Sequence, residues 1–273
     1  MAHVSFSAHA RVTAHIAVSD TSYLLTLEAP SVARAITPGQ FILLRCWEGV
    51  MPLLNRPFGA CRKDIARGTF TILYKVRGPA TRLMTRLTKG DRVAVTGPLG
   101  KGFDLAAARD AETLLLCAGG IGVGPIAFLS RQLRAKYPSK DMAVFCGART
   151  KKELFLQKDL EKIGAKIIVA TDDGSRGYKG LISDCMLGWC KDRKNKFSSS
   201  MAFACGPRLM SKSFITVSDA LGVPAQLLLE EHFACGVGAC YGCAVKVKRA
   251  HAVEYARICH DGPVFWADTL ILE

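Results

Sequence analysis

Residues 1 to about 105 contain short runs in which apolar and polar side chains alternate, with turn residues between them. Alternation with a period of two places one face of a strand in a core and the other in solvent. Several short strands separated by turns predict a β-sandwich or barrel. One helical pattern interrupts them, at about 81–87. The strands are expected at 10–18, 23–27, 40–45, 69–76 and 92–95.

The pattern changes between about 111 and 225, where short, continuous apolar runs alternate with helical spacing. Strands that alternate with helices predict a parallel sheet with helices on both faces. We expect strands at 114–117, 143–146, 166–170 and 201–205, and helices at 126–136 and 154–163.

The tail from about 226 holds several cysteines and few apolar residues, which is typical of a small module stapled by a metal. The predicted fold class is therefore multi-domain. An antiparallel β-barrel over 1–105 precedes an α/β nucleotide-binding domain with a parallel sheet over 106–225 and a small C-terminal module over 226–273.

Composition excludes several classes of protein. The chain has 273 residues and a formal net charge of +14, but its basic residues are scattered and the densest run, at 191–196, is short. We therefore expect no nucleic-acid partner. The uncharged stretch 113–130 is long enough for a membrane span but is interrupted by glycines, and no signal peptide is evident. We expect a soluble cytoplasmic protein with no membrane partner.

The cysteine pattern near the C-terminus carries the clearest chemistry. Three cysteines follow the spacing Cys-x4-Cys-x2-Cys on a glycine-rich stretch, and a fourth comes after fifteen intervening residues; they are Cys235, Cys240, Cys243 and Cys259. This is the plant-type [2Fe–2S] spacing, in which a tight loop wraps the cluster. Structural zinc, disulfides and free thiols remain as alternatives. Zinc usually shows two Cys-x2-Cys pairs, and eleven cysteines is an odd number for disulfides.

Two further segments follow expected strands at the edge where parallel sheets bind nucleotides. One is the turn containing Gly119, Gly120 and Gly122, whose bare backbone and helix start suit a phosphate; a tight structural turn is the alternative. The other is Cys205, Gly206 and Pro207. A small thiol there could approach a nicotinamide ring, or be a buried core cysteine.

Two segments of the β module are candidates for contact with a pyrophosphate or flavin. Arg56 lies at the end of a β segment and could fork onto phosphate oxygens. Thr81 is a plausible N-cap of the short helix. Capping without any ligand explains Thr81 equally well.

Together these motifs resemble the ferredoxin-reductase-like electron-transfer subunits of dihydroorotate dehydrogenase B. The resemblance covers almost the whole chain, and the cysteine segment with the Asp261–Phe265 ending is its most specific part. It is carried by Arg56-Pro57-Phe58, Leu73-Tyr74-Lys75-Val76, Gly97-Pro98-Leu99-Gly100, Gly119-Gly120-Ile121-Gly122, Cys205-Gly206-Pro207 and Glu230-Glu231 through Cys243, in this order.

The resemblance implies three cofactors: FAD on the barrel, NAD as co-substrate and a [2Fe–2S] cluster on the four cysteines. The FAD contacts that it implies are Arg56, Pro57, Phe58, Gly59, Leu73, Tyr74, Lys75, Ala80 and Thr81. Two positions depart from the family pattern. Gly59 stands where a serine or threonine is usual, so a hydroxyl near the flavin is absent, and Ala80 replaces a glycine.

The resemblance also implies a partner, the FMN-containing catalytic subunit that oxidises dihydroorotate to orotate in pyrimidine biosynthesis, in a heterotetramer of two plus two. Electrons would pass from partner FMN through the cluster and FAD to NAD+. A flavin is needed in between because NAD(H) exchanges two electrons and the cluster one. We find no catalytic acid, base or nucleophile in the chain. A subunit of a sulfide dehydrogenase or ferredoxin:NADP oxidoreductase, and a zinc-stapled binding protein without redox role, are the alternatives.

Overall fold

The computed structural model describes residues 6–192, 197, 199–249 and 252–272. The contacts divide the chain into two compact units, each of which draws on several segments. The first contains 1–102, 231–244 and 257–263, and the second contains 103–230, 245–256 and 264–273. Most of the basic run at 191–196 lies outside the described residues.

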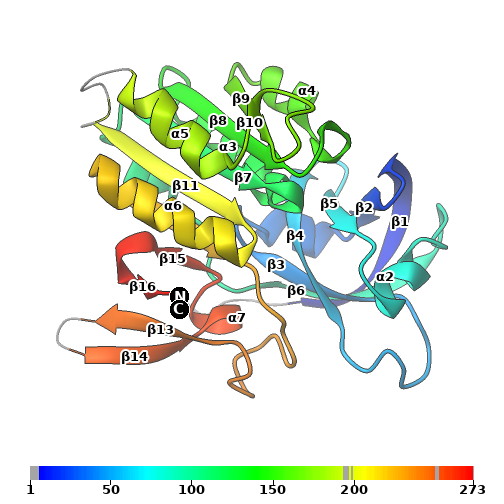
Figure 1. Ribbon diagram of the computed structural model, residues 1–273. Helices are drawn as coiled ribbons and strands as arrows, with labels where there is room; N and C mark the ends of the chain where they lie inside the picture. The colour runs from blue at the N-terminus through cyan, green and yellow to red at the C-terminus, as the bar shows by residue number, and fades with distance from the viewer. Residues whose placement is uncertain (1–5, 193–196, 198, 250–251, 273) are drawn as a thin grey trace. The chain divides into compact units, whose positions relative to one another are not determined.

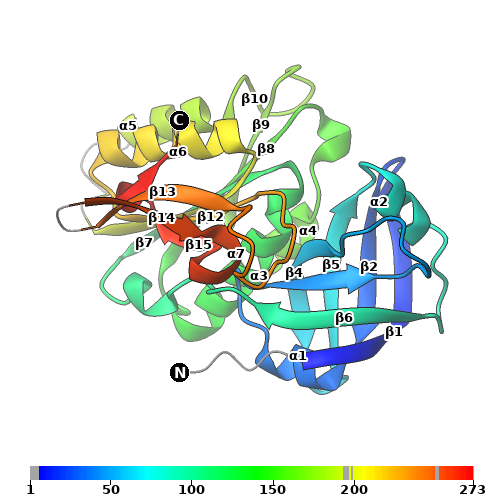
Figure 2. The ribbon, with the colours of Figure 1, turned by 90° about the horizontal axis from the view of Figure 1, so that it is seen from below.

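The first unit is built on a closed six-stranded antiparallel barrel in the order β1-β2-β5-β4-β3-β6, whose strands Figure 2 shows from below. Apolar side chains at alternate positions fill its interior, among them Leu25, Leu27 and Ile72, all fully buried. The strands are β1 (Phe6–Ser19), β2 (Ser22–Glu28), β3 (Phe41–Arg45), β4 (Arg56–Asp64), β5 (Thr69–Lys75) and β6 (Arg92–Leu99).

Two short helices accompany the barrel, α1 (Pro30–Ala35) and α2 (Pro79–Met84). Each begins at a proline, whose fixed φ suits the first helical position. Helix α2 therefore starts and ends earlier than the expected 81–87, and its N-cap is Gly78 instead of Thr81. The expected N-cap role of Thr81 is wrong because Pro79 starts the helix two residues upstream.

The second unit is built on a seven-stranded sheet in the order β10-β9-β8-β7-β11-β12-β15 (Figure 1). All neighbouring strands are parallel except β15, which runs antiparallel to β12. The strands are β7 (Thr113–Gly119), β8 (Asp141–Ala148), β9 (Lys166–Thr171), β10 (Tyr178–Lys179), β11 (Ser200–Gly206), β12 (Ala225–Leu229) and β15 (Val264–Trp266).

Helices cover both faces of this sheet, as expected (Figure 1). Helices α3 and α4 contact each other, and so do α5 and α6. Helix α4 is shorter than the predicted 154–163 because Leu156, just before it, has a left-handed φ of 58°. The helices are α3 (Val123–Lys136), α4 (Gln157–Glu161), α5 (Ile182–Lys191) and α6 (Arg208–Leu221), with 3-10 turns η1 (Leu105–Ala108), η2 (Gly120–Gly122) and η3 (Lys151–Glu153).

The stretch after 225 contributes to both units. Its cysteine segments belong to the first unit, whereas β12, β15 and a three-stranded sheet in the order β14-β13-β16 belong to the second. The stretch has few apolar residues, so its parts share larger cores. Its remaining elements are β13 (Ala244–Arg249), β14 (Ala252–Arg257), α7 (Ile258–Asp261), η4 (Ala267–Thr269) and β16 (Leu270–Ile271).

No helix in the described part of the chain is long and apolar enough to cross a membrane.

Candidate functional site

The cysteine loop 235–243 curls tightly because three of its residues adopt left-handed backbone conformations. The φ angles are 69° at Gly236, 84° at Gly238 and 57° at Tyr241. A Cβ atom at Gly238 would lie 2.8 Å from Cβ of His260, next to Cys259, and one at Gly236 would lie 2.8 Å from Cδ1 of Leu43. Glycine is thus required where the loop touches its neighbours.

All four cysteine sulfurs accept a backbone hydrogen bond. The N–H groups of Val237, Gly238, Gly242 and Cys259 donate to Sγ of Cys235, Cys259, Cys240 and Cys243, at 3.5, 3.2, 3.4 and 3.4 Å respectively. Hydrogen bonds of this kind stabilise a thiolate and tune the metal that it ligates. Cys243 and Cys259 are buried, Cys235 is half-buried and Cys240 is exposed.

Hydrogen bonds shift the ionisation of these thiols in opposite directions. Burial disfavours the thiolate of Cys235, but hydrogen bonds from the backbone of Val237, Ala239 and Cys240 and from the Cys240 thiol outweigh it and lower its pKa to about 6. Burial, then the hydrogen bond and charge of Cys243, raise the pKa of Cys259 to about 12. A bound cation would be needed to deprotonate all four.

The four side chains form two neighbouring pairs. Cys235 is hydrogen-bonded to Cys240, Cys243 is hydrogen-bonded to Cys259, and Cys259 lies within electrostatic range of Cys235. A two-iron cluster is held by four cysteines spread over two metals. The donor set of four thiols in two neighbouring pairs fits this requirement.

The predicted FAD residues lie on strands that separate from one another. The ladder between β4 and β5 runs from Asp64–Thr69 to Ala60–Ile72 and records no further pairs among the described residues. Beyond it, residues 56–59 pair with β3 and residues 73–75 with β2. The facing edges of 56–59 and 73–75 therefore leave backbone groups outside this ladder, and such groups require partners. This opening fits a flavin bound through backbone contacts.

Two aromatic side chains meet across this opening. The rings of Phe58 and Tyr74 are edge to face with centroids 6.0 Å apart. Tyr74 is fully buried, and its hydroxyl lies 2.9 Å from Nε2 of His15, whose Nδ1 is 2.8 Å from the carbonyl oxygen of Leu87. Because a carbonyl only accepts, Nδ1 carries the proton and, in the neutral ring, Nε2 accepts from Tyr74. Burial, then the charges of Tyr23 and Cys46, raise the pKa of Tyr74.

The remaining predicted FAD residues have partners within the chain. Arg56 donates to the carbonyl oxygen of Leu54 and lies 6.0 Å over the ring of Trp47. The hydroxyl of Thr81 accepts from the N–H of Arg77 and Gly78 at 2.9 and 3.1 Å. Ala80 is buried beside it. The contacts of Thr81 stabilise the start of α2, whose N-cap is Gly78. The contacts of all these residues with FAD stay predictions.

The predicted NAD residues meet at the point where the strand order of the sheet reverses. From β7 the chain builds outward through β8, β9 and β10, and then returns to place β11 on the other side of β7. The glycine turn ends β7, and Cys205-Gly206-Pro207 ends β11, at the same edge. Dinucleotides bind at such switch points, outside the carboxyl ends of the strands.

At two of these glycines neighbouring atoms leave no room for a side chain, whereas the third faces open space that a ligand could fill. A Cβ atom at Gly122 would lie 2.4 Å from the carbonyl oxygen of Cys205, and one at Gly119 would lie 2.5 Å from Sδ of Met210. At Gly120, with φ +54°, a Cβ atom would meet open space among the described residues. The side chain of Cys205 is only 1% exposed, and burial, then the charge of Glu230, raises the pKa of its thiol.

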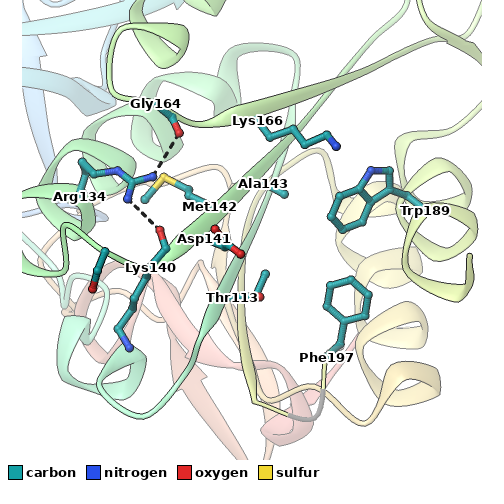
Figure 3. A pocket seen from close by; sticks show the side chains of 11 residues that line it. Thr113, Arg134, Lys140, Asp141, Met142, Ala143, Gly164, Lys166, Trp189 and Phe197 are labelled. Carbon is teal, nitrogen blue, oxygen red and sulfur yellow. Dashed lines mark hydrogen bonds between the residues drawn. The ribbon is translucent and has the colours of Figure 1, made fainter. Parts of the chain in front are cut away.

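A second hollow, of about 440 Å³, opens at the opposite edge of the sheet, where β7, β8 and β9 begin (Figure 3). Lys166 and the rings of Trp189 and Phe197 line it. Arg134 donates to the carbonyl oxygens of Pro138, Lys140, Ile163 and Gly164, so its guanidinium is bonded to the loops that follow α3 and α4. The hollow therefore offers no phosphate site and lies at the wrong edge for the glycine turn.

Comparison with known proteins assigns the domains. A model described as the oxidoreductase NAD-binding domain matches residues 116–215, and one described as the iron-sulfur cluster binding domain of dihydroorotate dehydrogenase B matches 230–271. The electron transfer subunit of dihydroorotate dehydrogenase B (NAD(+)) from Desulforamulus reducens is 36% identical over 94% of this chain and 95% of that protein. The Geobacillus thermodenitrificans protein of the same name is 37% identical over 93% and 95%.

The chain belongs to the family of dihydroorotate dehydrogenase B electron transfer subunits. The resemblance drawn from the motifs and the predicted fold class are thereby confirmed. An NADH-dependent reduced ferredoxin-NADP oxidoreductase superposes with a TM-score of 0.82 at 26% identity, over 97% of this chain and 90% of that one. A ferredoxin NADP+ reductase from Neisseria gonorrhoeae with bound FAD and NADP shares the fold, with a TM-score of 0.67 at 17% identity over 79% and 92%.

Membership in this family makes the chain an oxidoreductase electron-transfer subunit, and the two matched models give NAD and an iron–sulfur cluster as groups that it binds. The word subunit in the names of its relatives implies a catalytic partner. Three residues that contact the candidate sites were not predicted: His15, Trp47 and Arg257. His15 is far in sequence from Tyr74 and Leu87, and nothing in the local pattern marks Trp47, although it contacts the nearby Arg56. Only the position of Arg257 two residues before Cys259 could have pointed to it.

Proposed function

We propose that this chain passes electrons from a dihydroorotate-oxidising, FMN-containing partner subunit to NAD+, through a [2Fe–2S] cluster and FAD, as one step of pyrimidine biosynthesis. One observation carries the proposal: four paired cysteine sulfurs, each accepting a backbone N–H, in a chain of this family. When bound, FAD would supply the exchange between single electrons and electron pairs that connects a cluster to NAD+.

The chain's own residues would bind and orient these groups. Cys235, Cys240, Cys243 and Cys259 would hold the cluster, and the N–H groups that they accept would stabilise the thiolates. The backbone of 56–59 and 73–75 would hold FAD, with the Phe58 and Tyr74 rings fixed against each other and Ala80 and Thr81 at the start of α2. Gly119, Gly120, Gly122, Cys205, Gly206 and Pro207 would receive NAD.

The exposed position of Cys240 supports docking of the partner next to the cluster, since electron transfer between subunits requires that their redox groups lie close together. We propose a heterotetramer of two copies of each subunit. The division of the chain into a barrel, a nucleotide-binding domain and a cluster segment remains our proposal for its domain organisation, with the cluster segment shared between the two units.

The proposal is tested with the full chain co-expressed with the FMN-containing subunit. Cys240→Ser is expected to remove the visible absorption of the cluster and the reduction of NAD+ by dihydroorotate. Exchange of electrons between NADH and the bound flavin should persist. Cys61→Ser, a change at a buried thiol of the barrel, is the control and should keep the cluster. An unchanged cluster spectrum in Cys240→Ser would contradict the ligand assignment.

A second candidate function is that of a ferredoxin:NADP oxidoreductase subunit, favoured by the superposition with the NADH-dependent reduced ferredoxin-NADP oxidoreductase. The higher identity to the dihydroorotate dehydrogenase subunits ranks it second. The two candidate functions are distinguished by which electron donor the chain accepts. NAD+ reduction by dihydroorotate through the partner supports the first function, and reduction by reduced ferredoxin alone supports the second.

A further inference from the structure

A charged group beside Cys259 connects the two segments that carry the thiols. Arg257 and Asp261 flank Cys259 and form a two-pronged ion pair, with Nε of Arg257 3.0 Å from Oδ2 of Asp261 and Nη2 3.2 Å from Oδ1. The backbone N–H of Arg257 also donates to Oδ2 at 2.8 Å. The side chains are only 25% and 20% exposed, so the guanidinium is held in one place by a rigid fork.

From this fixed position the guanidinium reaches across to the cysteine loop. Its Nη1 donates to the carbonyl oxygen of Gly238 at 3.0 Å, and its Cζ lies 5.1 Å from the ring centroid of Tyr241. Gly238 is the residue whose N–H donates to Sγ of Cys259. Arg257 therefore connects α7, which supplies Cys259, to the loop that supplies the other three cysteines.

The same geometry places a permanent positive charge within electrostatic range of Cys259. His260 lies between the two charged groups, with Nδ1 2.9 Å from Oδ1 of Asp261 and 3.2 Å from Nη2 of Arg257. Since Nδ1 donates to the carboxylate, the imidazole adds a second contact that holds Asp261 in place.

We propose that Arg257 is a positioning residue that anchors the cysteine loop and raises the reduction potential of the cluster, with Asp261 as the opposing charge. The inference rests on the proposed cluster. One-electron reduction adds one negative charge to a four-thiolate cluster and takes up no proton. A nearby cation stabilises this extra charge, and a nearby carboxylate opposes it.

Removing the positive charge of Arg257 and removing the negative charge of Asp261 should shift the reduction potential of the cluster in opposite directions. A purely structural role of the two residues would not predict opposite shifts. In the complete complex, Arg257→Gln should lower the cluster's midpoint potential, seen as a severalfold drop in the ratio of reduced to oxidised cluster at one applied potential. Asp261→Asn removes the negative charge and keeps an oxygen acceptor, and should raise that ratio. Arg257→Lys keeps the charge and should stay close to wild type. Added salt should shrink each shift, because the pair is partly exposed.

The measurement is a redox titration followed by the cluster's electron paramagnetic resonance signal, with iron and sulfide counted for each variant. Arg67→Gln is the matched control, because Arg67 pairs with Asp64 on the turn between β4 and β5. It should leave the potential unchanged. If Arg257→Gln loses its iron, the potential of Asp261→Asn decides the sign, with Arg257→Lys as the variant that keeps the charge.

Equal potentials in all variants, or shifts of Arg257→Gln and Asp261→Asn in the same direction, would overturn the inference and leave the proposed function standing. A wild-type chain that holds no iron and sulfide would overturn the proposed function itself, and this inference with it.

Discussion

Packing in the cysteine loop is close at Gly238, and we expect Gly238→Ala to destabilise the site by an amount that the geometry sets. The residue has a φ of 84°, and the added methyl group would lie 2.8 Å from Cβ and 2.9 Å from Cγ of His260. A left-handed conformation costs an L-residue about 1–2 kcal/mol. Forcing a methyl group into a filled space typically costs a further ~1–3 kcal/mol.

The matched control is Gly49→Ala, in the loop between β3 and β4 of the same unit. Gly49 has a φ of 72°, but an added Cβ would meet no described atom within 4 Å. The control therefore carries the conformational cost alone. The difference between the two variants isolates the contact with His260, at about 1–3 kcal/mol.

The assay compares the thermal midpoint of the cluster-free chain and the half-life of bound iron in excess chelator. Gly238→Ala should lower both more than Gly49→Ala, because it also moves the N–H that donates to Sγ of Cys259. Equal losses of stability and of iron in the two variants would refute the reasoning, since they would mean that the loop and α7 are not packed as the structure has them.

Three further predictions follow from the two units. Gly122→Ala should destabilise the second unit severely, because its Cβ would lie 2.4 Å from a backbone oxygen. Gly120→Ala should cost only the about 1–2 kcal/mol of its left-handed φ and should also weaken NADH binding. Thermal melts and fluorescence titration with NADH separate the two variants, and equal melts would contradict the packing. Tyr74→Phe should cost about 0.5–1.5 kcal/mol by removing the hydrogen bond to His15, measured by urea unfolding. A cost of zero would show that the bond is absent. In the cluster-free chain, iodoacetamide at neutral pH should label Cys235 first, because the pKa of its thiol is about 6. It should spare Cys146, because burial raises the pKa of that thiol to about 12. Mass spectrometry gives the order of labelling, and labelling of Cys146 ahead of Cys235 would contradict this prediction.

Sequence patterns predicted those elements whose burial alternates cleanly and missed those with polar buried faces. The first four residues of β6 alternate between exposed and buried, and β2 alternates over most of its length. Helix α6 was not predicted, since its buried face includes Ser211 and Ser218 beside Phe214 and Val217. Helix α5 was also not predicted, because Gly188 and Cys190 in its last turns weaken the helical signal. Helix α1 was not predicted because its six residues are too few to show a periodic pattern.

The cysteine spacing predicted which residues approach one another, but not how the strands prepare a flavin site. Spacing is a local property, and a loop of nine residues can bring its own sulfurs together. The end of the β4–β5 ladder at Ala60–Ile72 depends on the pairing of two other strands, β2 and β3, and no local pattern at residues 56–59 reports it. The same holds for the Tyr74–His15 hydrogen bond, which joins residues 59 positions apart.

The division of the chain into units places the segments of the one-electron step together. The cysteine segments contact the barrel within the first unit: the rings of Phe233 and Phe41 have centroids 5.0 Å apart, Gly236 lies against Leu43, and Pro263 lies beside Gly100. Electron transfer falls steeply with distance, so a cluster on these cysteines and a flavin on the barrel would benefit from sharing one unit. The residues proposed for NAD belong to the second unit.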